Sequence, residues 1–242
     1  MDIKRFFVSP TDKCGEEIFI NGEELAHLTK VLRYKVGYKA VISMGDGLDY
    51  WCTITHIDKS QAVAHIDQIT VNESVPSVEI VLCQALPKGD KLDLIVQKAV
   101  ELGVSEIVPF RSQFVAENKF NGERLARISM EASKQCGRAE IVKVGDLVDF
   151  DQMLQYIKDC DIVILPYENA SCGKIGNVQG LEKAHKIAIV VGSEGGFDES
   201  EVGQAKSMGA QIVSLGKRIL RCETAAIVAT SLVLYEKGEL SQ

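Results

Sequence analysis

The apolar residues are spaced in one pattern up to residue 72 and in a different pattern after it. Three short runs (40–44, 50–55 and 62–66) are rich in β-branched and aromatic residues, with glycine- and aspartate-bearing turns between them. Such runs predict β-strands. Leucine and valine recur at helical spacing over 25–32, and a glycine ends that pattern. We therefore predict a small β-barrel with one helix in this part of the chain.

Beyond residue 77, apolar runs alternate with amphipathic segments. The runs are continuous, as in strands buried on both faces, and they lie at 78–86, 107–110, 161–165, 187–191 and 211–215. Helical patterns occupy 90–102, 123–135, 198–209 and 223–237. This alternation predicts an α/β domain, a mostly parallel sheet with helices on both faces. The polar segment 71–77 contains a proline and serves as the linker, so the predicted domains are 1–72 and 73–242.

Composition places the chain among ordinary soluble proteins, with 46% hydrophobic and 25% charged residues. No apolar run reaches the ~18 residues of a membrane helix, and the N-terminus lacks the apolar core of a signal peptide. Seven cysteines occur without a C-x-x-C pair. Free thiols in a reducing compartment are therefore expected, and zinc ligation is not. We expect a cytoplasmic protein with no membrane segment and no metal.

A net charge of −7 argues against non-specific coating of nucleic acid. A local basic segment is still present, because residues 25–45 contain no acid. Lys30, Arg33 and Lys35 lie there among aromatic residues, and Lys88 follows the first long strand. Local positive charge can contact phosphates, and aromatic rings can stack on unpaired bases. These four residues are our candidates for RNA binding, although a solvated basic helix end would show the same pattern.

A glycine-rich block follows the strand 187–191 and precedes a capped helix. In Gly192-Ser193-Glu194-Gly195-Gly196, the glycines let a ligand approach backbone N–H groups. The block is neither G-x-G-x-x-G nor G-x-x-x-x-G-K-[ST], and Glu194 would repel a phosphate. It therefore favours a neutral or cationic ligand. The alternative is a tight turn between strand and helix.

A second block, 215–226, follows the last predicted strand. Ile219 and Leu220 are apolar although they lie in a loop between two arginines. They suggest a flat aromatic ligand such as adenine, or an interface. The alternative is a core-facing loop with solvated arginines. Together with the loop at 165–168, three strand ends would meet at one sheet edge and form one pocket. The histidines lie elsewhere in the sequence and no G-x-S-x-G elbow exists, so a hydrolase is not supported.

These motifs resemble a known family. The segments 88–91, 97–104 and 134–138 and the two C-terminal blocks are similar to those of the bacterial 16S ribosomal RNA uracil-N3 methyltransferases (the RsmE family) of the SPOUT superfamily. The resemblance spans essentially the whole chain, including His27-Leu28 and Val31-Leu32-Arg33. Ser193 departs from the family pattern, which usually has proline there.

The resemblance implies a PUA-like RNA-binding barrel followed by a SPOUT-type α/β domain with a trefoil knot. The knot would hold S-adenosylmethionine, whose cationic sulfonium suits a carboxylate-bearing loop. Candidate cofactor-binding residues come from the three loops: Leu165, Gly192, Gly195, Gly196, Leu215, Gly216, Ile219 and Leu220. A homodimer is implied as well, with each site near the partner chain.

The implied reaction is methylation of N3 of a uridine in the decoding region of 16S ribosomal RNA. Free RNA and the assembled 30S subunit are both open as the substrate, and the acidic net charge favours the 30S subunit. N3 carries a proton that must be lost, so arginines near O2 or O4 would stabilise the forming anion. Arg138 and Arg221 are the candidates for that role, and Glu194 is the candidate base or sulfonium partner. Two alternatives remain: a SPOUT methyltransferase acting on another rRNA or tRNA position, and a non-catalytic RNA-binding ribosome assembly factor. A dinucleotide oxidoreductase is disfavoured because G-x-G-x-x-G is missing.

Overall fold

The computed structural model describes residues 3–115, 119–170 and 173–240. The chain divides into two compact units. The first unit comprises 1–75 together with 133–141, and the second comprises 76–132 and 142–242. The sequence predicted domains of 1–72 and 73–242, so the structure groups one internal segment, 133–141, with the N-terminal residues rather than with the residues around it.

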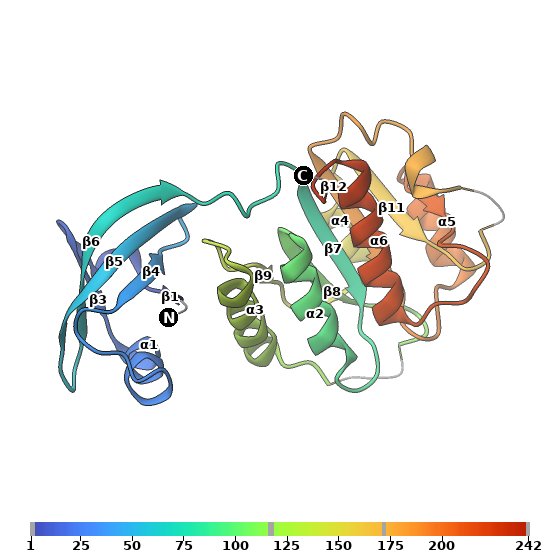
Figure 1. Ribbon diagram of the computed structural model, residues 1–242. Coiled ribbons are helices and arrows are strands. Elements are labelled where there is room, and N and C mark those ends of the chain that lie inside the picture. Colours follow the sequence, from blue (N-terminus) through green and yellow to red (C-terminus); the bar gives the residue numbers. More distant parts are fainter. Residues whose placement is uncertain (1–2, 116–118, 171–172, 241–242) are drawn as a thin grey trace. The chain divides into compact units, whose positions relative to one another are not determined.

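The first unit is a six-stranded sheet curved around one core (Figure 1). Its strands run in the order β1-β4-β5-β6-β3-β2, and only β1 and β4 pair in parallel. The strand bounds are β1 Lys4–Phe7, β2 Lys13–Cys14, β3 Glu17–Ile20, β4 Lys39–Ser43, β5 Leu48–Ile57 and β6 Ala62–Val71. A 3-10 turn, η1, covers Pro10–Asp12, and helix α1 (Gly22–Ala26) continues into a π-helical turn, η2 (His27–Val31). The predicted β-rich unit with one helix is thereby confirmed.

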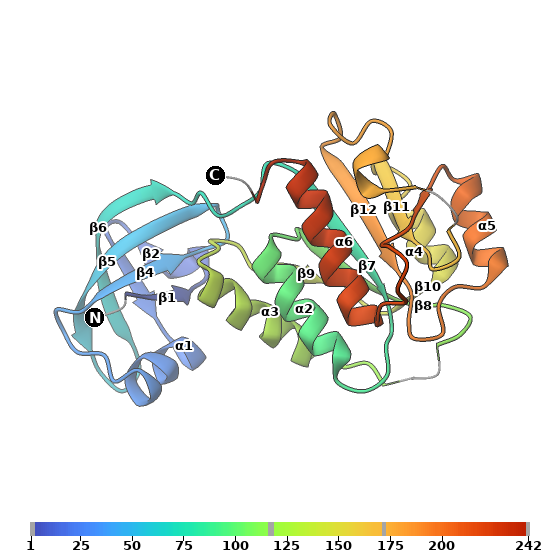
Figure 2. The same cartoon turned by 45° about the vertical axis from the view of Figure 1, so that its right-hand side comes forward.

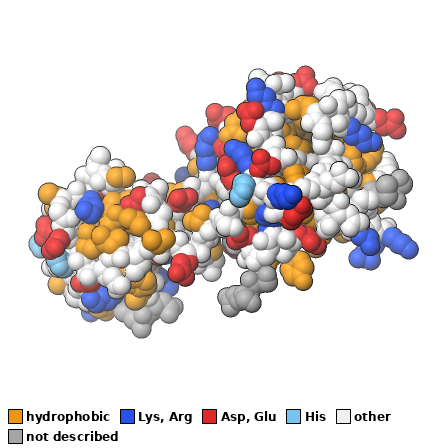
Figure 3. All heavy atoms as spheres, turned by 90° about the horizontal axis from the view of Figure 1, so that it is seen from above, with side chains coloured by type: hydrophobic (Ala, Val, Ile, Leu, Met, Phe, Trp, Pro, Cys, Tyr) orange, Lys and Arg blue, Asp and Glu red, His pale blue; other side chains and the backbone are white. Residues whose placement is uncertain are grey.

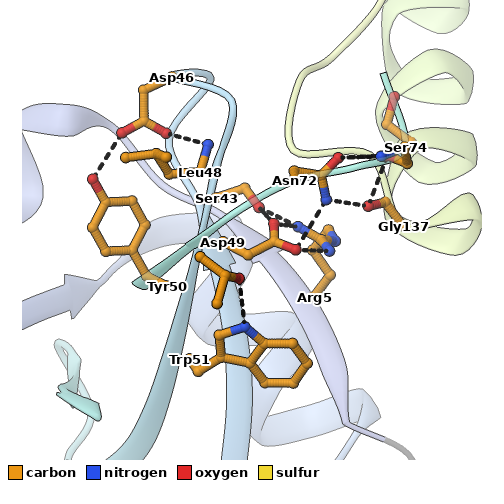
Figure 4. Close-up of polar contacts among 12 residues, drawn as sticks. Arg5, Ser43, Asp46, Leu48, Asp49, Tyr50, Trp51, Asn72, Ser74 and Gly137 are labelled. Atoms are coloured by element: carbon orange, nitrogen blue, oxygen red, sulfur yellow. Dashed lines mark hydrogen bonds and ion pairs between the residues drawn. The ribbon is translucent and has the colours of Figure 1, made fainter. Parts of the chain in front are cut away.

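A buried polar network fastens the segment 133–141 within the first unit (Figure 4). Arg5 and Asp49 form a two-pronged ion pair, with Nη1 donating to Oδ1 at 2.5 Å and Nη2 to Oδ2 at 3.0 Å. Their side chains are only 10% and 9% exposed. The Asn72 amide donates both to Asp49 Oδ2 and to the Gly137 carbonyl oxygen, each at 2.9 Å. The β-sheet, the chain at Asn72 and the turn at Gly137 therefore share one set of hydrogen bonds.

The second unit is a parallel sheet in the order β10-β8-β7-β12-β11-β13, with β9 beside β8. The strand bounds are β7 Glu79–Ala85, β8 Glu106–Arg111, β9 Lys143–Val144, β10 Val148–Asp149, β11 Ile162–Pro166, β12 Lys186–Val191 and β13 Gln211–Val213. The helices are α2 Lys91–Leu102, α3 Gly122–Cys136, α4 Phe150–Tyr156, α5 Glu199–Ser207 and α6 Cys222–Glu236, with a 3-10 turn, η3, at Ile175–Asn177. The last turn of α3 belongs to the first unit.

Helices cover both faces of this sheet, as predicted. Helices α2 and α6 lie side by side on one face, where α6 contacts β7 and β12 (Figures 1 and 2). Side chains of α4 and α5, such as Phe150, Met153 and Val202, pack on the other face together with Phe110 and Phe197. Helix α4 was not predicted, because its seven residues are too short for a periodic pattern; an Asp149 capping box starts it instead. No helix among the described residues is both long and apolar enough to cross a membrane.

The parallel arrangement determines where the loops meet. Strands β7, β12, β11 and β13 are neighbours in that order and run in the same direction, so their carboxyl ends lie along one sheet edge. The loops after β11, β12 and β13, which are far apart in sequence, therefore emerge together. This edge is where ligands bind in open α/β sheets.

Candidate functional site

The loops that follow β11, β12 and β13 enclose a cavity of about 270 Å³. The size suits a small organic ligand rather than a metal ion or a water molecule. Its lining residues are Pro166, Tyr167, Glu168, Val191, Gly192, Ser193, Glu194, Gly196, Phe197, Ser214, Leu215, Gly216, Arg218, Ile219, Leu220, Arg221, Cys222 and Ala225. The three strand-end loops predicted from the sequence thus line one pocket.

A tight turn forms the β12 side of the pocket. Gly196 has a φ of +69°, which favours glycine, and its N–H donates to the Ser193 carbonyl oxygen at 3.1 Å. The Ser193 hydroxyl also accepts from the Gly195 N–H at 3.4 Å. Helix α5 then begins at a capping box formed by Asp198 and Glu201. The turn closes with serine at position 193, so a proline there is not required for its geometry.

Two glycines of this turn have aromatic side chains close behind them. A Cβ atom on Gly195 would lie 2.6 Å from Phe114 Cβ, and one on Gly192 would lie 3.2 Å from the Phe197 ring. Phe197 is buried and stacks on Phe110 with ring centroids 6.4 Å apart. The turn therefore packs closely against Phe114 and Phe197, and Gly192 and Gly196 also line the pocket.

The β13 side of the pocket combines a glycine bend with exposed apolar groups. Gly216 has a φ of +112°, and its N–H donates to Ser214 Oγ at 3.2 Å. Ile219 is 87% exposed, an unusual state for an isoleucine at a pocket. Helix α6 begins at Cys222, where burial and the neighbouring Glu223 raise the pKa of the thiol to about 12. The thiol is therefore neutral, and the surface available to a ligand here is mainly apolar.

Glu194 is tied to the loop after β7. The Lys88 N–H donates to Glu194 Oε1 at 3.1 Å, and Lys91 Nζ lies 2.5 Å from the same oxygen. Burial raises the pKa of the Glu194 carboxyl, but the hydrogen bonds from Lys91 and Lys88 outweigh it and hold the pKa below its usual value. Glu194 is therefore a carboxylate engaged by a cation, and it links the β12 turn to the start of α2.

The structure brings most of the predicted site residues together. Six of the predicted cofactor-binding residues line the pocket: Gly192, Gly196, Leu215, Gly216, Ile219 and Leu220. Leu165 and Gly195 do not line it but adjoin lining residues. Of the predicted catalytic residues, Glu194 and Arg221 line the pocket and Arg138 does not. The functional roles of all these residues stay predictions.

Arg138 lies in the first unit, within the segment 133–141. It is 3% exposed, and burial lowers the pKa of its guanidinium. The predicted RNA-binding residues Lys30, Arg33 and Lys35 are exposed on the first unit, and Lys88 is exposed on the second. Arg33 has a φ of +54°, so the basic segment contains a left-handed backbone bend at a non-glycine residue.

Sequence reasoning assigned no role to several pocket residues, among them Glu168 and Arg218. Both lie in loops that the sequence placed at strand ends, and that position is the signal that could have identified them. Acidic and basic side chains are interspersed over the visible face of the second unit (Figure 3). The pocket itself has two carboxylates and two arginines and no lysine among its lining residues. It is therefore unlike a phosphate cradle, which concentrates positive charge.

Comparison with known families matches both parts of the chain. Residues 74–234 match a family described as an RNA methyltransferase domain. Residues 20–67 match a family described as an RNA methyltransferase PUA domain. The first match covers the sheet and the pocket, and the second covers most of the curved N-terminal sheet.

Several known proteins are similar to nearly the whole chain. A protein of Bacillus subtilis (strain 168), named ribosomal RNA small subunit methyltransferase E, is 33% identical, with 97% of each chain covered. A crystal structure of a protein of that name from Neisseria gonorrhoeae, bound to S-adenosylmethionine, is 28% identical with a TM-score of 0.85, covering 97% of this chain and 98% of that one. A Legionella pneumophila methyltransferase structure in complex with the same cofactor is 26% identical with a TM-score of 0.86 and the same coverage.

Proposed function

The chain belongs to the ribosomal RNA small subunit methyltransferase E family, and from this premise we propose that it transfers a methyl group from S-adenosylmethionine to N3 of a uridine in the decoding region of 16S ribosomal RNA. The observation that carries the proposal is the pocket formed by the loops after β11, β12 and β13. It lies in the RNA methyltransferase domain, and the same chain carries a PUA domain.

The pocket residues fit this cofactor. S-adenosylmethionine has an adenine and a cationic sulfonium but no phosphate, and the pocket offers exposed apolar groups and carboxylates. Ile219 and Leu220 would flank the adenine, and Gly192, Gly196 and Gly216, which have no side chains, would let the cofactor approach the backbone closely. When bound, the cofactor supplies an electrophilic methyl group.

The protein's own contribution is alignment and charge. Methyl transfer depends on holding the attacking nitrogen in line with the methyl group. N3 must give up its proton, either to a water molecule or to Glu194, the candidate base, before or during its attack on the methyl group. The negative charge that this leaves on the uracil oxygens would be stabilised by Arg221, which lines the pocket. Arg138 is proposed for the same role, but it is 3% exposed and does not line the pocket, so the assignment rests on Arg221. N3 lies on the base-pairing edge, so the uridine must be unpaired or flipped out.

The Lys91–Glu194 contact should matter for cofactor binding. Replacing Lys91 with methionine removes the cation that holds Glu194 and loosens the link between the β12 turn and α2. Both side chains are partly exposed and solvent screens their attraction, so we expect a modest effect, a rise of roughly fivefold in the dissociation constant for S-adenosylmethionine. Calorimetric titration measures this.

A matched control lies on the same helix. Lys98 pairs with Glu101 at 2.8 Å with similar exposure, away from the pocket. Lys98→Met should bind the cofactor like the wild type. If Lys91→Met and Lys98→Met bound S-adenosylmethionine with equal affinity, the proposed role of Glu194 in linking the β12 turn to α2 would be contradicted.

Three further features are proposed together with the function. The loops after β11, β12 and β13 would form a trefoil knot, the active protein would be a homodimer, and the substrate would be the assembled 30S subunit. The net charge of −7 supports the last point, because an acidic protein gains little from non-specific attraction to RNA and needs docking that depends on shape.

Methyl transfer to three substrates tests the proposal. Labelled S-adenosylmethionine is incubated with the protein and with 30S subunits, free 16S RNA or 50S subunits, the 30S subunits and 16S RNA coming from cells that lack this enzyme. We expect label on the 30S subunit, less on free 16S RNA and none on the 50S subunit. A protein that binds 30S subunits but transfers no label to any substrate would be the non-catalytic assembly factor instead.

A further inference from the structure

The two carboxylates of the pocket differ in their hydrogen bonds and ion pairs. Glu194 is engaged by Lys91 and by the Lys88 N–H. Glu168, which follows β11, is exposed, and its carboxylate has no hydrogen bond or ion pair with any residue in the described ranges. Glu168 is therefore the pocket carboxylate available to a ligand.

The backbone before Glu168 is held firmly. Pro166 at the end of β11 pairs with Val213 of β13, and the next N–H, that of Tyr167, donates to the Val213 carbonyl oxygen at 2.9 Å. Glu168 is the residue after this contact, so the position of its Cα atom is well defined. The backbone immediately before Glu168 is thus fixed by the neighbouring strands.

The Glu168 carboxylate lies against the glycine turn. Its Oε1 is 2.6 Å from the position that a Cβ atom on Gly196 would take. Any side chain at position 196 would therefore compete with this carboxylate for space. Gly196 both provides the left-handed bend of the turn and leaves room for a negative charge beside it.

An ionised group in a partly enclosed cavity favours a ligand of opposite charge. Arg218 and Arg221 line the same pocket, yet neither forms an ion pair with Glu168. We infer that Glu168 binds a positive charge of S-adenosylmethionine, either its sulfonium or its ammonium group. The inference rests on the proposed function and adds a cofactor-binding residue to it, while Glu194 keeps the turn in place.

The test measures binding, not turnover. Glu168→Gln keeps the size of the side chain and removes its charge. We expect its dissociation constant for S-adenosylmethionine to rise about tenfold, equivalent to about 1.4 kcal/mol. Glu182→Gln is the matched control, because Glu182 is exposed and lies outside the pocket. It should bind like the wild type.

Two further ligands show which positive group of S-adenosylmethionine Glu168 binds. S-adenosylhomocysteine keeps the ammonium but has no sulfonium, so unchanged affinity for it would assign Glu168 to the sulfonium, and an equal loss would assign it to the ammonium. Methylthioadenosine lacks both charges and should bind wild type and variant equally, which also shows that the variant is folded. Unchanged affinity of Glu168→Gln for S-adenosylmethionine would overturn the inference, even if turnover fell. Failure of the wild type to bind S-adenosylmethionine would instead overturn the proposed function.

Discussion

Replacing Gly195 with alanine is expected to weaken S-adenosylmethionine binding at least tenfold while the protein stays folded. A Cβ atom at this position would lie 2.6 Å from Phe114 Cβ and 3.1 Å from the Phe114 carbonyl oxygen. Neither atom is the far end of a flexible side chain, so the turn itself must move. The turn forms one side of the pocket, and a shift there displaces the backbone groups of Gly192 and Gly196 from the ligand.

Gly203 offers a control for this substitution. It lies within helix α5, and a Cβ atom there would have no neighbour within 4 Å. Gly203→Ala should leave cofactor binding unchanged and stabilise the helix by about 0.5–1 kcal/mol. Isothermal titration gives the affinities and chemical denaturation gives the stabilities. Wild-type affinity in Gly195→Ala would mean that the position of the turn is not important for binding.

The second large effect concerns stability. Replacing Arg5 with methionine should lower the free energy of unfolding by about 3–5 kcal/mol, because it leaves the buried Asp49 carboxylate without its cation. Urea denaturation followed by circular dichroism measures the change. Lys39→Met removes an ion pair with Asp67 whose side chains are 58% and 35% exposed, so it should cost less than about 1 kcal/mol. Equal losses in the free energy of unfolding for the two variants would contradict the claim that the buried ion pair stabilises the protein more than the exposed one.

The same ion pair should make the stability of the protein depend on pH. Burial raises the pKa of Asp49, but hydrogen bonds from Arg5 and Asn72 outweigh it, so the folded pKa lies below the ordinary 3.8. A lowered carboxyl pKa contributes stability that is fully present above the unfolded pKa and is lost as the pH falls through the folded pKa. The wild type should therefore lose stability below about pH 4 more steeply than Asp49→Asn, which has no carboxyl group at this position.

Local patterns in the sequence predicted the elements of the fold well. The continuous apolar run of β7 and the glycine that follows α2 each identify an element without reference to distant residues. The parallel sheet followed from their alternation, and the pocket followed from placing three loops at strand ends. Short elements such as α4 were missed, because a single capping box determines them and no periodicity does.

Contacts between residues far apart in the chain could not be predicted from the sequence. Nothing near Gly137 indicates that its carbonyl oxygen accepts from Asn72, 65 positions earlier, or that 133–141 belongs with the N-terminal residues. Glu168 and Glu194 look alike in the sequence, since each follows a buried strand. Their difference arises because Lys91, 103 positions before Glu194, reaches only that carboxylate.

The most direct test of the proposed reaction is to locate the methyl group on the RNA. Small subunits from cells that lack this enzyme are reacted with the protein and S-adenosylmethionine, and the 16S RNA is digested and mapped by mass spectrometry against nucleoside standards. We predict 3-methyluridine at a single position in the decoding region. A methyl group on a ribose 2′-oxygen, or on a base atom other than uridine N3, would contradict the proposed reaction.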